Sequence, residues 1–183
     1  MTILKVEQRE LDLFVEKLLC VIDFDKDLPE NVFLRDEYIY WFFERPLLCF
    51  YDLFSGLVLE SVSSFKSDVF IKFSGGQPLS GSCFSIDSSN ISGDSNWLVV
   101  NSENFFEGTV GYPIVLCNDT DDWFAFESAH EEFGVLAVNK SSLHEGFLGY
   151  LNANLISMSD LSELAKTSVA EGVIAQVLIS YYG

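Results

Sequence analysis

The sequence predicts an α+β fold, in which one largely antiparallel sheet carries an N-terminal helix and C-terminal helices within a single domain, residues 1–183. Three observations predict it. Apolar residues repeat with helical spacing near the N-terminus, short apolar runs alternate with polar turns in the middle, and helical patterns return after Asn139. Strands that are grouped between helices favour antiparallel pairing. A hydrophobic share of 49% over 183 residues is enough for a core.

The first element is an amphipathic helix within Val6–Phe24, where Leu11, Phe14, Val15 and Leu18 recur at the spacing of one helix face. Its acidic residues lie mostly in the first half, where they suit the helix dipole.

The next segments predict strands and hairpins. Asn31–Phe43 is ambiguous, but its aromatic second half favours a strand. Leu47–Tyr51 and Leu57–Val62 flank a Ser-Gly turn and indicate one hairpin. Asp68–Phe73 and Ser82–Ile86, joined by a Gly/Pro/Ser turn, indicate another.

The middle of the chain predicts a loop followed by more strands. Asp87–Asn96 has the composition of a loop, and Trp97–Asn101 resembles a strand. Asn104–Gly111 is predicted to be irregular or a short helix, and Tyr112–Cys117 is predicted to be a strand.

A hairpin at the centre of the sheet is predicted by two dense apolar runs, Trp123–Phe126 and Phe133–Val138. They surround a short polar turn, Ser128–Glu132, and their composition indicates strands that are buried on both faces. The hairpin is therefore the feature around which we expect the sheet to form.

Helices are predicted after the hairpin. Ser141–Leu151 suits a helix that is capped by Ser141 or Ser142, and a second helix starts near Ser159 with acids in its first turn. Val169–Tyr182 is mostly apolar and predicts a helix or a final strand.

The charge balance restricts the partners. Ten Lys and Arg against 28 Asp and Glu give a net charge of −18 and a pI near 4.1. Ten of the acids, and no Lys or Arg, lie between Phe73 and Asn139. Such a field opposes direct binding to nucleic acids and to anionic membranes, and it suits a basic protein or a divalent cation. Acidity that only keeps an aromatic-rich protein soluble is the alternative.

Cysteine usage and hydropathy predict a cytoplasmic protein without a membrane span. Cys20, Cys49, Cys83 and Cys117 are widely spaced within apolar runs, which indicates buried, reduced thiols. The N-terminus lacks a signal-peptide pattern, and the most apolar stretch, Tyr38–Leu59, contains charges that oppose membrane insertion.

No motif for a metal, a cofactor or a nucleophile is present. His130, Glu131 and Glu132 contain ligand-type side chains, but neighbouring residues on an extended turn point in opposite directions. We therefore expect neither a metal nor a cofactor, and no enzymatic activity. The alternative is a metal-assisted hydrolase using a carboxylate pair, for which Glu127 is the best candidate because it follows the apolar run Trp123–Phe126.

Trp123–Val138, WFAFESAHEEFGVLAV, resembles the immunity proteins of bacterial toxin systems, such as those of contact-dependent growth inhibition, as do the chain's size and acidity. The resemblance implies a bacterial protein that binds and neutralises a cognate toxin, expected to be a basic nuclease whose cleft an acidic surface can occupy. An acidic adaptor or structural subunit is a further alternative. The residues expected to bind the toxin are the acids around the central hairpin: Asp119, Asp121, Asp122, Glu127, Glu131 and Glu132.

Overall fold

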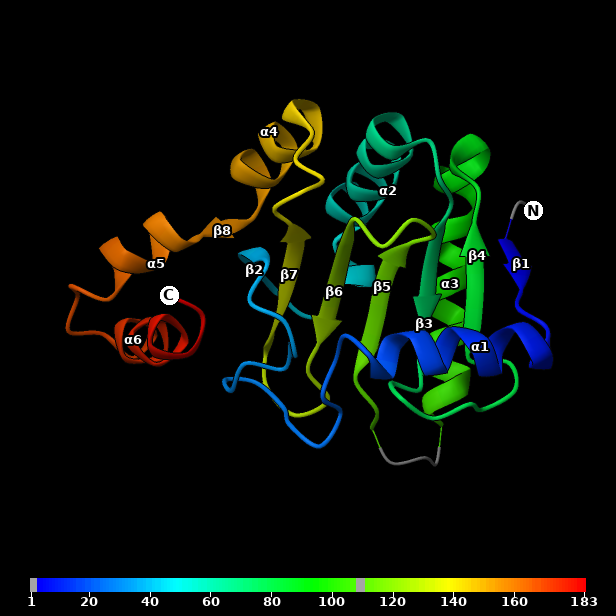
Figure 1. Cartoon of the computed structure of the whole chain (residues 1–183), viewed down its shortest axis with the longest axis horizontal. Helices are drawn as coiled ribbons and strands as arrows, with labels where there is room; N and C mark the ends of the chain where they lie inside the picture. The colour runs from blue at the N-terminus through cyan, green and yellow to red at the C-terminus, as the bar shows by residue number, and fades with distance from the viewer. Residues whose placement is uncertain (1–2, 108–110) are drawn as a thin grey trace.

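The predicted α+β fold is confirmed by a computed structural model, which describes residues 3–107 and 111–183. Within these ranges, eight strands form one antiparallel sheet in the order β1-β4-β3-β5-β6-β7-β2-β8 (Figure 1). The strands are β1 Ile3–Lys5, β2 Tyr38–Glu44, β3 Val69–Lys72, β4 Cys83–Ile86, β5 Ile114–Asn118, β6 Trp123–Glu127, β7 Phe133–Asn139 and β8 Ile156–Ser157.

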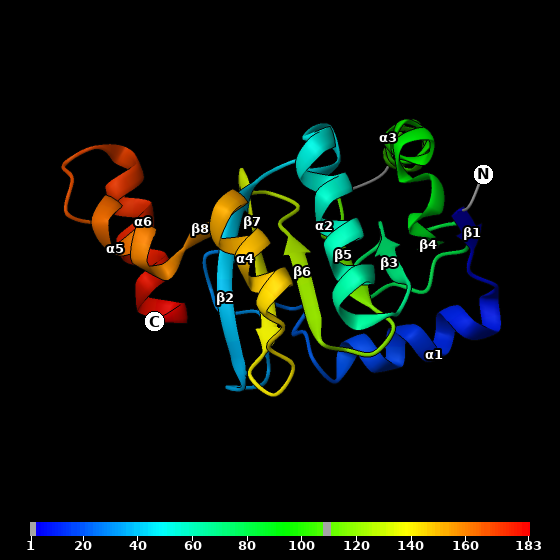
Figure 2. The same ribbon diagram turned by 90° about the horizontal axis from the view of Figure 1, so that it is seen from above.

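Helices cover both faces of this sheet. Helices α2, α3 and α4 lie on one face and α1 lies on the other, while α5 and α6 follow β8 at the end of the sheet (Figures 1 and 2). The helices are α1 Gln8–Leu19, α2 Tyr51–Phe65, α3 Ile91–Phe106, α4 Glu145–Asn154, α5 Met158–Leu164 and α6 Ala170–Tyr182. Two 3₁₀ turns, η1 Leu47–Cys49 and η2 Ser88–Asn90, precede α2 and α3.

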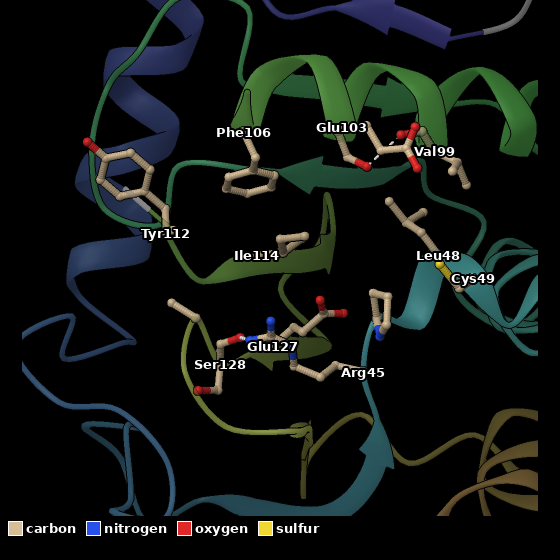
Figure 3. Close-up of a pocket in the computed structure, with 14 residues that line it drawn as sticks. Arg45, Leu48, Cys49, Val99, Glu103, Phe106, Tyr112, Ile114, Glu127 and Ser128 are labelled. Atoms are coloured by element: carbon tan, nitrogen blue, oxygen red, sulfur yellow. Dashed lines mark hydrogen bonds between the residues drawn. The ribbon is translucent and has the colours of Figure 1, made fainter. Parts of the chain in front are cut away.

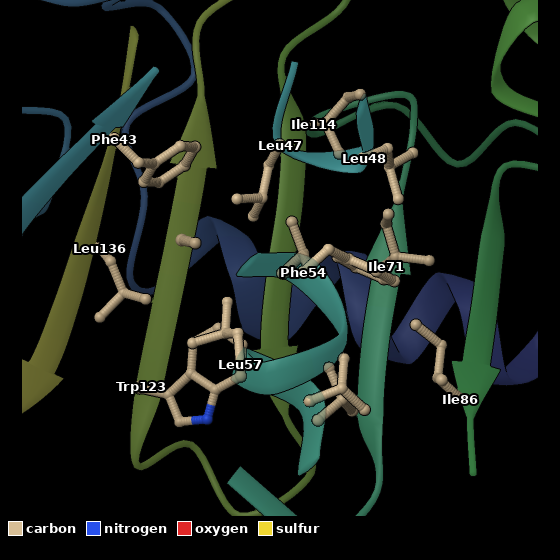
Figure 4. Close-up of a cluster of buried hydrophobic side chains, with 14 of the residues drawn as sticks. Phe43, Leu47, Leu48, Phe54, Leu57, Ile71, Ile86, Ile114, Trp123 and Leu136 are labelled. Atoms are coloured by element: carbon tan, nitrogen blue, oxygen red, sulfur yellow. The ribbon is translucent and has the colours of Figure 1, made fainter. Parts of the chain in front are cut away.

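The central hairpin is buried on both faces, as predicted. Trp123 and Ala125 of β6 belong to the core under α2 and α4, whereas Phe124 and Phe126 belong to the core on the opposite face. Figure 4 shows Trp123 beside Leu57 of α2. Because side chains alternate along a strand, the next residue of β6 on the α2 face is Glu127, and this alternation positions the site described below.

The hairpin predicted for Leu47–Val62 is wrong, since η1 and α2 occupy this stretch. The buried residues of α2 include Phe54, Leu57, Val58 and Ser61, which follow helical spacing, and Ser61 accepts a hydrogen bond from Trp123 Nε1 at 2.7 Å. The Ser-Gly pair inside this helix has the composition of a turn, and for this reason the sequence predicted a hairpin here.

The loop and strand predicted for Asp87–Asn101 are also wrong. Asp87 accepts a hydrogen bond from Ser89 N at 2.9 Å and caps η2, after which α3 runs through to Phe106. For Asn104–Gly111, predicted to be irregular or a short helix, the first residues form the end of α3. Residues 108–110 of that prediction lie outside the described residues.

The remaining predictions of elements are confirmed, with shifted ends. These are α1, strand β2, the β3–β4 hairpin, β5 and the C-terminal helices, of which α6 takes the helical alternative. The residue that precedes α4 at its N-terminus is His144, so the predicted Ser141 or Ser142 cap is wrong. Helix α5 begins with a capping box in which Ser157 and Asp160 exchange hydrogen bonds.

All four cysteines lie in the described part of the chain and are free thiols. Cys83 and Cys117 are buried as predicted, whereas Cys20 and Cys49 are exposed, so the prediction of four buried thiols is wrong for these two. Among the described residues, no helix has both the length and the apolar character needed to cross a membrane.

Candidate functional site

The acids around the central hairpin fall into two groups at opposite ends of β6. Asp119, Asp121 and Asp122 lie in the β5–β6 turn, and Glu131 and Glu132 lie in the β6–β7 turn. The five residues of β6 separate the turns by roughly 17 Å at the usual rise of a strand. The structure therefore divides the predicted acidic surface into two.

Two carboxylates of the β5–β6 turn make structural contacts, one with α1 and one within the turn. The Asp121 carboxylate pairs with Lys17 Nζ of α1 at 2.7 Å. The Asp122 carboxylate accepts hydrogen bonds from the Thr120 hydroxyl and, at 2.7 Å, from Asn118 Nδ2. Of the three acids in this turn, Asp119 alone is exposed, and the other two are half-buried.

The pKa of Asp122 reflects this bonding. Partial burial raises the pKa, but hydrogen bonds from Ser142, Thr120 and Asn118 outweigh burial and lower the pKa below its ordinary value. Asp122 is therefore an ionised hydrogen-bond acceptor that stabilises the turn, and its main role is structural.

The β6–β7 turn, in contrast, presents its acids to solvent. Ser128 Oγ accepts hydrogen bonds from the backbone N–H groups of His130 at 3.0 Å and Glu131 at 2.8 Å, which fixes the turn from inside. Arg45 holds both ends of the turn: its guanidinium donates to the Ser128 carbonyl, and its backbone N–H donates to the Glu132 carbonyl at 3.1 Å. The Glu131 and Glu132 side chains remain exposed.

Glu127 is buried, so it does not lie on the exposed acidic surface on which the sequence placed it. Its exposed fraction is 4%, and its Oε2 accepts a hydrogen bond from the Leu47 N–H at 2.9 Å. Burial raises the pKa of Glu127, against the opposing effects of this hydrogen bond and of the positive charge of Arg45. The alternation of β6 causes this placement, because Glu127 shares a face with Trp123 and Ala125.

Glu127 lies in a hollow of about 400 Å³, which we call the Glu127 pocket. Figure 3 shows its carboxyl group directed into the hollow, with Phe106 and Tyr112 on one side and Leu48 on the other. The walls are mostly apolar and come from η1, α3 and the β5 and β6 strands. The described lining residues are Arg45, Pro46, Leu48, Cys49, Val99, Ser102, Glu103, Phe106, Gly111, Tyr112, Ile114, Glu127, Ser128 and Ala129.

A second hollow, of about 580 Å³, lies on the other side of the same turn, and we call it the α6 groove. Its apolar lining comes from β2, α5 and α6, and includes Phe42, Leu161 and Ile174. Glu44, Glu132 and Glu171 also line it. Beside this groove, α6 exposes apolar side chains to solvent: the exposed fraction is 59% for Val173 and 45% for Ile174.

The two hollows therefore flank one acidic turn. The Glu127 pocket contains Ser128, the α6 groove contains Glu132, and both contain Arg45. Arg45 is the sole basic residue among the described residues that line either hollow. The sequence indicated Glu131 and Glu132, but not Glu44 or Glu171, because the antiparallel pairing of β2 with β7 and the return of α6 bring these distant residues together.

Within residues 3–107 and 111–183, no group of three or more His, Cys, Asp or Glu side chains has an arrangement that could hold a metal ion. His130 is exposed on the turn, outside both hollows. No protein-family model, no curated protein and no solved structure matches the chain.

Proposed function

We propose that this protein binds and neutralises a basic protein, as an immunity protein does with its cognate toxin. One observation carries the proposal: the exposed acidic turn Glu131–Glu132 stands between two apolar hollows whose other rim charges are largely acidic. Protein interfaces combine an apolar centre, which releases water, with a polar rim that selects the partner. The β6–β7 end of the sheet has both components.

The charge of the chain supports a basic partner in this proposal. A net charge of −18 accelerates encounter with a basic surface and disfavours association with a second copy, which would bring the same charge. A nuclease has a basic cleft for the phosphate backbone, and an acidic inhibitor that covers this cleft prevents substrate from entering. The toxin in this proposal is therefore a basic nuclease.

Two matched charge-reversal variants test the proposal. E131K/E132K reverses the turn between the hollows, and E16K/D119K reverses two exposed acids away from it, one on α1 and one in the β5–β6 turn. The partner is captured from a bacterial lysate and identified, and affinity is then measured with purified proteins. The first variant should bind at least about tenfold more weakly, mainly through slower association, and the second within about twofold of wild type.

Both variants must keep the wild-type melting temperature, so that weaker binding reports the surface and not the fold. Equal weakening by both variants would mean that overall charge alone attracts the partner. No weakening by E131K/E132K would refute the proposed binding surface.

A further inference from the structure

We propose that the Glu127 pocket binds a single ammonium group carried on an apolar stem. The group has two sources with the same chemistry, a lysine side chain of a protein or a free small amine. The proposal does not depend on the toxin partner, because it concerns the hollow itself: a cavity of about 400 Å³ with apolar walls and one carboxylate directed into it.

The carboxylate has one oxygen left for a ligand. Oε2 of Glu127 accepts from the Leu47 N–H at 2.9 Å, and among the described residues no donor bonds to Oε1. The nearby Arg45 guanidinium is turned toward the Ser128 carbonyl and makes no ion pair with Glu127 within the described part of the chain. A buried carboxylate with a free oxygen is stabilised most by a cation that enters the same low-dielectric space.

The geometry favours an ammonium over a guanidinium. A guanidinium binds a carboxylate best through two parallel hydrogen bonds, which require both oxygens. An ammonium is a compact point charge that needs only one. With Oε2 occupied by the Leu47 N–H, Glu127 offers the contact that suits an ammonium.

The walls suit an apolar stem. Leu48, Val99 and Ile114 supply aliphatic surface, and Phe106 and Tyr112 supply aromatic surface on the other side (Figure 3). Aromatic rings also attract cations through their negatively charged faces. A further acid, Glu103, lies exposed in the lining and adds to the attraction for a cation.

A purely structural role is the simpler explanation of Glu127, since its carboxylate accepts from the first residue of η1. That role requires neither an adjoining hollow nor a carboxyl group directed into it. The two explanations differ in one measurable property, the selective binding of amines.

The experiment compares phenethylamine with its neutral counterpart, 2-phenylethanol, by titration monitored through backbone amide shifts. The amine should bind at least about tenfold more tightly than the alcohol. Glu127→Gln, which keeps an acceptor for the Leu47 N–H, should weaken amine binding by at least about tenfold. Glu10→Gln removes the same charge from an exposed position on α1, outside both hollows, and should leave amine binding within about twofold.

Alkylation of the two exposed thiols provides a second readout in the wild-type protein. Cys49 lines the hollow, whereas Cys20 is exposed elsewhere and serves as an internal control. Bound phenethylamine should slow the reaction of Cys49 with iodoacetamide and leave Cys20 unchanged. Equal binding of amine and alcohol, or equal weakening by both glutamine variants, would overturn the proposal.

The source of the ammonium is decided by a parallel arm with Nα-acetyl-lysine methylamide and with the purified basic partner. Tighter binding of the lysine compound than of its norleucine analogue, together with weaker partner binding by Glu127→Gln, assigns the pocket to a lysine of the partner. Amine binding that depends on Glu127, with unchanged partner binding, assigns it to a free amine. In that second case the proposed toxin surface stands unaffected.

Discussion

Lys72 is a charged residue buried inside the core, which is costly in free energy. Its side chain is fully buried, and its Nζ donates to the hydroxyls of Ser74 and Ser82 and, at 2.6 Å, to the Gln77 carbonyl. Burial lowers the pKa of Lys72 to about 8, while burial raises the pKa of the neighbouring Cys83 to about 12. The charged amine is therefore tied to a polar loop inside an otherwise apolar core.

The sign of the resulting pH dependence follows from proton binding. The pKa of Lys72 is about 8 in the folded chain against an ordinary 10.5, so the unfolded chain binds more protons between these values. Lys72 thus makes the folded state more stable as pH rises through this window. The raised pKa values of Cys83 and Cys117 act in the opposite direction, so wild-type stability alone would not isolate the lysine.

Comparing the wild type with the Lys72→Met variant isolates the contribution of Lys72 to the pH dependence of stability. Between about pH 7 and about pH 9.5, the unfolding free energy of the wild type should gain about 2 kcal/mol relative to the variant, because only the wild type sheds the buried charge. Urea unfolding of both proteins at a series of pH values measures the gap. A gap that stays constant with pH would show that Lys72 contributes packing alone.

At the scale of elements, the contact between α2 and α4 depends on a glycine. A Cβ added at Gly56 would lie 2.7 Å from Tyr150 Cε2, closer than carbon atoms approach without overlap. The Tyr150 hydroxyl donates to the Leu53 carbonyl at 2.8 Å, so the ring is fixed where Gly56 leaves room. Gly149 of α4 is the matched opposite, because a Cβ added there would meet no atom of the described chain within 4 Å.

Gly56→Ala and Gly149→Ala should therefore change stability in opposite directions. Alanine gains up to about 1 kcal/mol over glycine in a helix, and overlap in a packed core costs about 1–3 kcal/mol. We expect Gly149→Ala to raise the melting temperature and Gly56→Ala to lower it. In a Tyr150→Ala background the loss at Gly56 should disappear, and its persistence would argue against this contact.

The same helix α2 explains how far the sequence predicted the fold. Strands β6 and β7 were predictable because each is a short, dense apolar run with a polar turn between them. Helices α2 and α3 were not, because serine and glycine within them have turn propensity that packing against the sheet overrides. In α2, Ser61 serves as the acceptor for a buried tryptophan N–H, a contact that no local pattern contains.

The candidate site was predictable in part for the same reason. The acids of the β6–β7 turn follow from composition, since a polar turn between buried strands must face water. The burial of Glu127 was implied by strand alternation, which continues the face of Trp123. Glu44 and Glu171 join the site only through strand pairing and the return of α6, which act over long sequence separations.

At the scale of the whole molecule, charge repulsion opposes the fold. With 28 acids and ten bases, one-to-one pairing would leave eighteen acids without a basic counterpart. Part of this charge gathers at the β6–β7 end, where Glu44, Glu132 and Glu171 line one groove. A compact state with this net charge is stabilised when salt screens the repulsion.

Salt should therefore raise the melting temperature. The Debye length, over which charges interact before salt screens them, falls from about 30 Å at 0.01 M salt to about 8 Å at 0.15 M. A stabilisation of about 1 kcal/mol corresponds to about 2–4 °C for a chain of this size, and we expect a rise of at least this order. Equal rises in NaCl and KCl would identify screening, whereas an unchanged or falling melting temperature would contradict it.

The central claim, that a basic protein binds across the acidic turn and the two hollows beside it, is tested most directly by hydrogen–deuterium exchange of the complex. We expect slower exchange on binding in Ser128–Glu132 and in α6, with the β5–β6 turn at Asp119–Asp122 unchanged. Slower exchange confined to Asp119–Asp122 or to α1, with the β6–β7 turn unaffected, would contradict the claim.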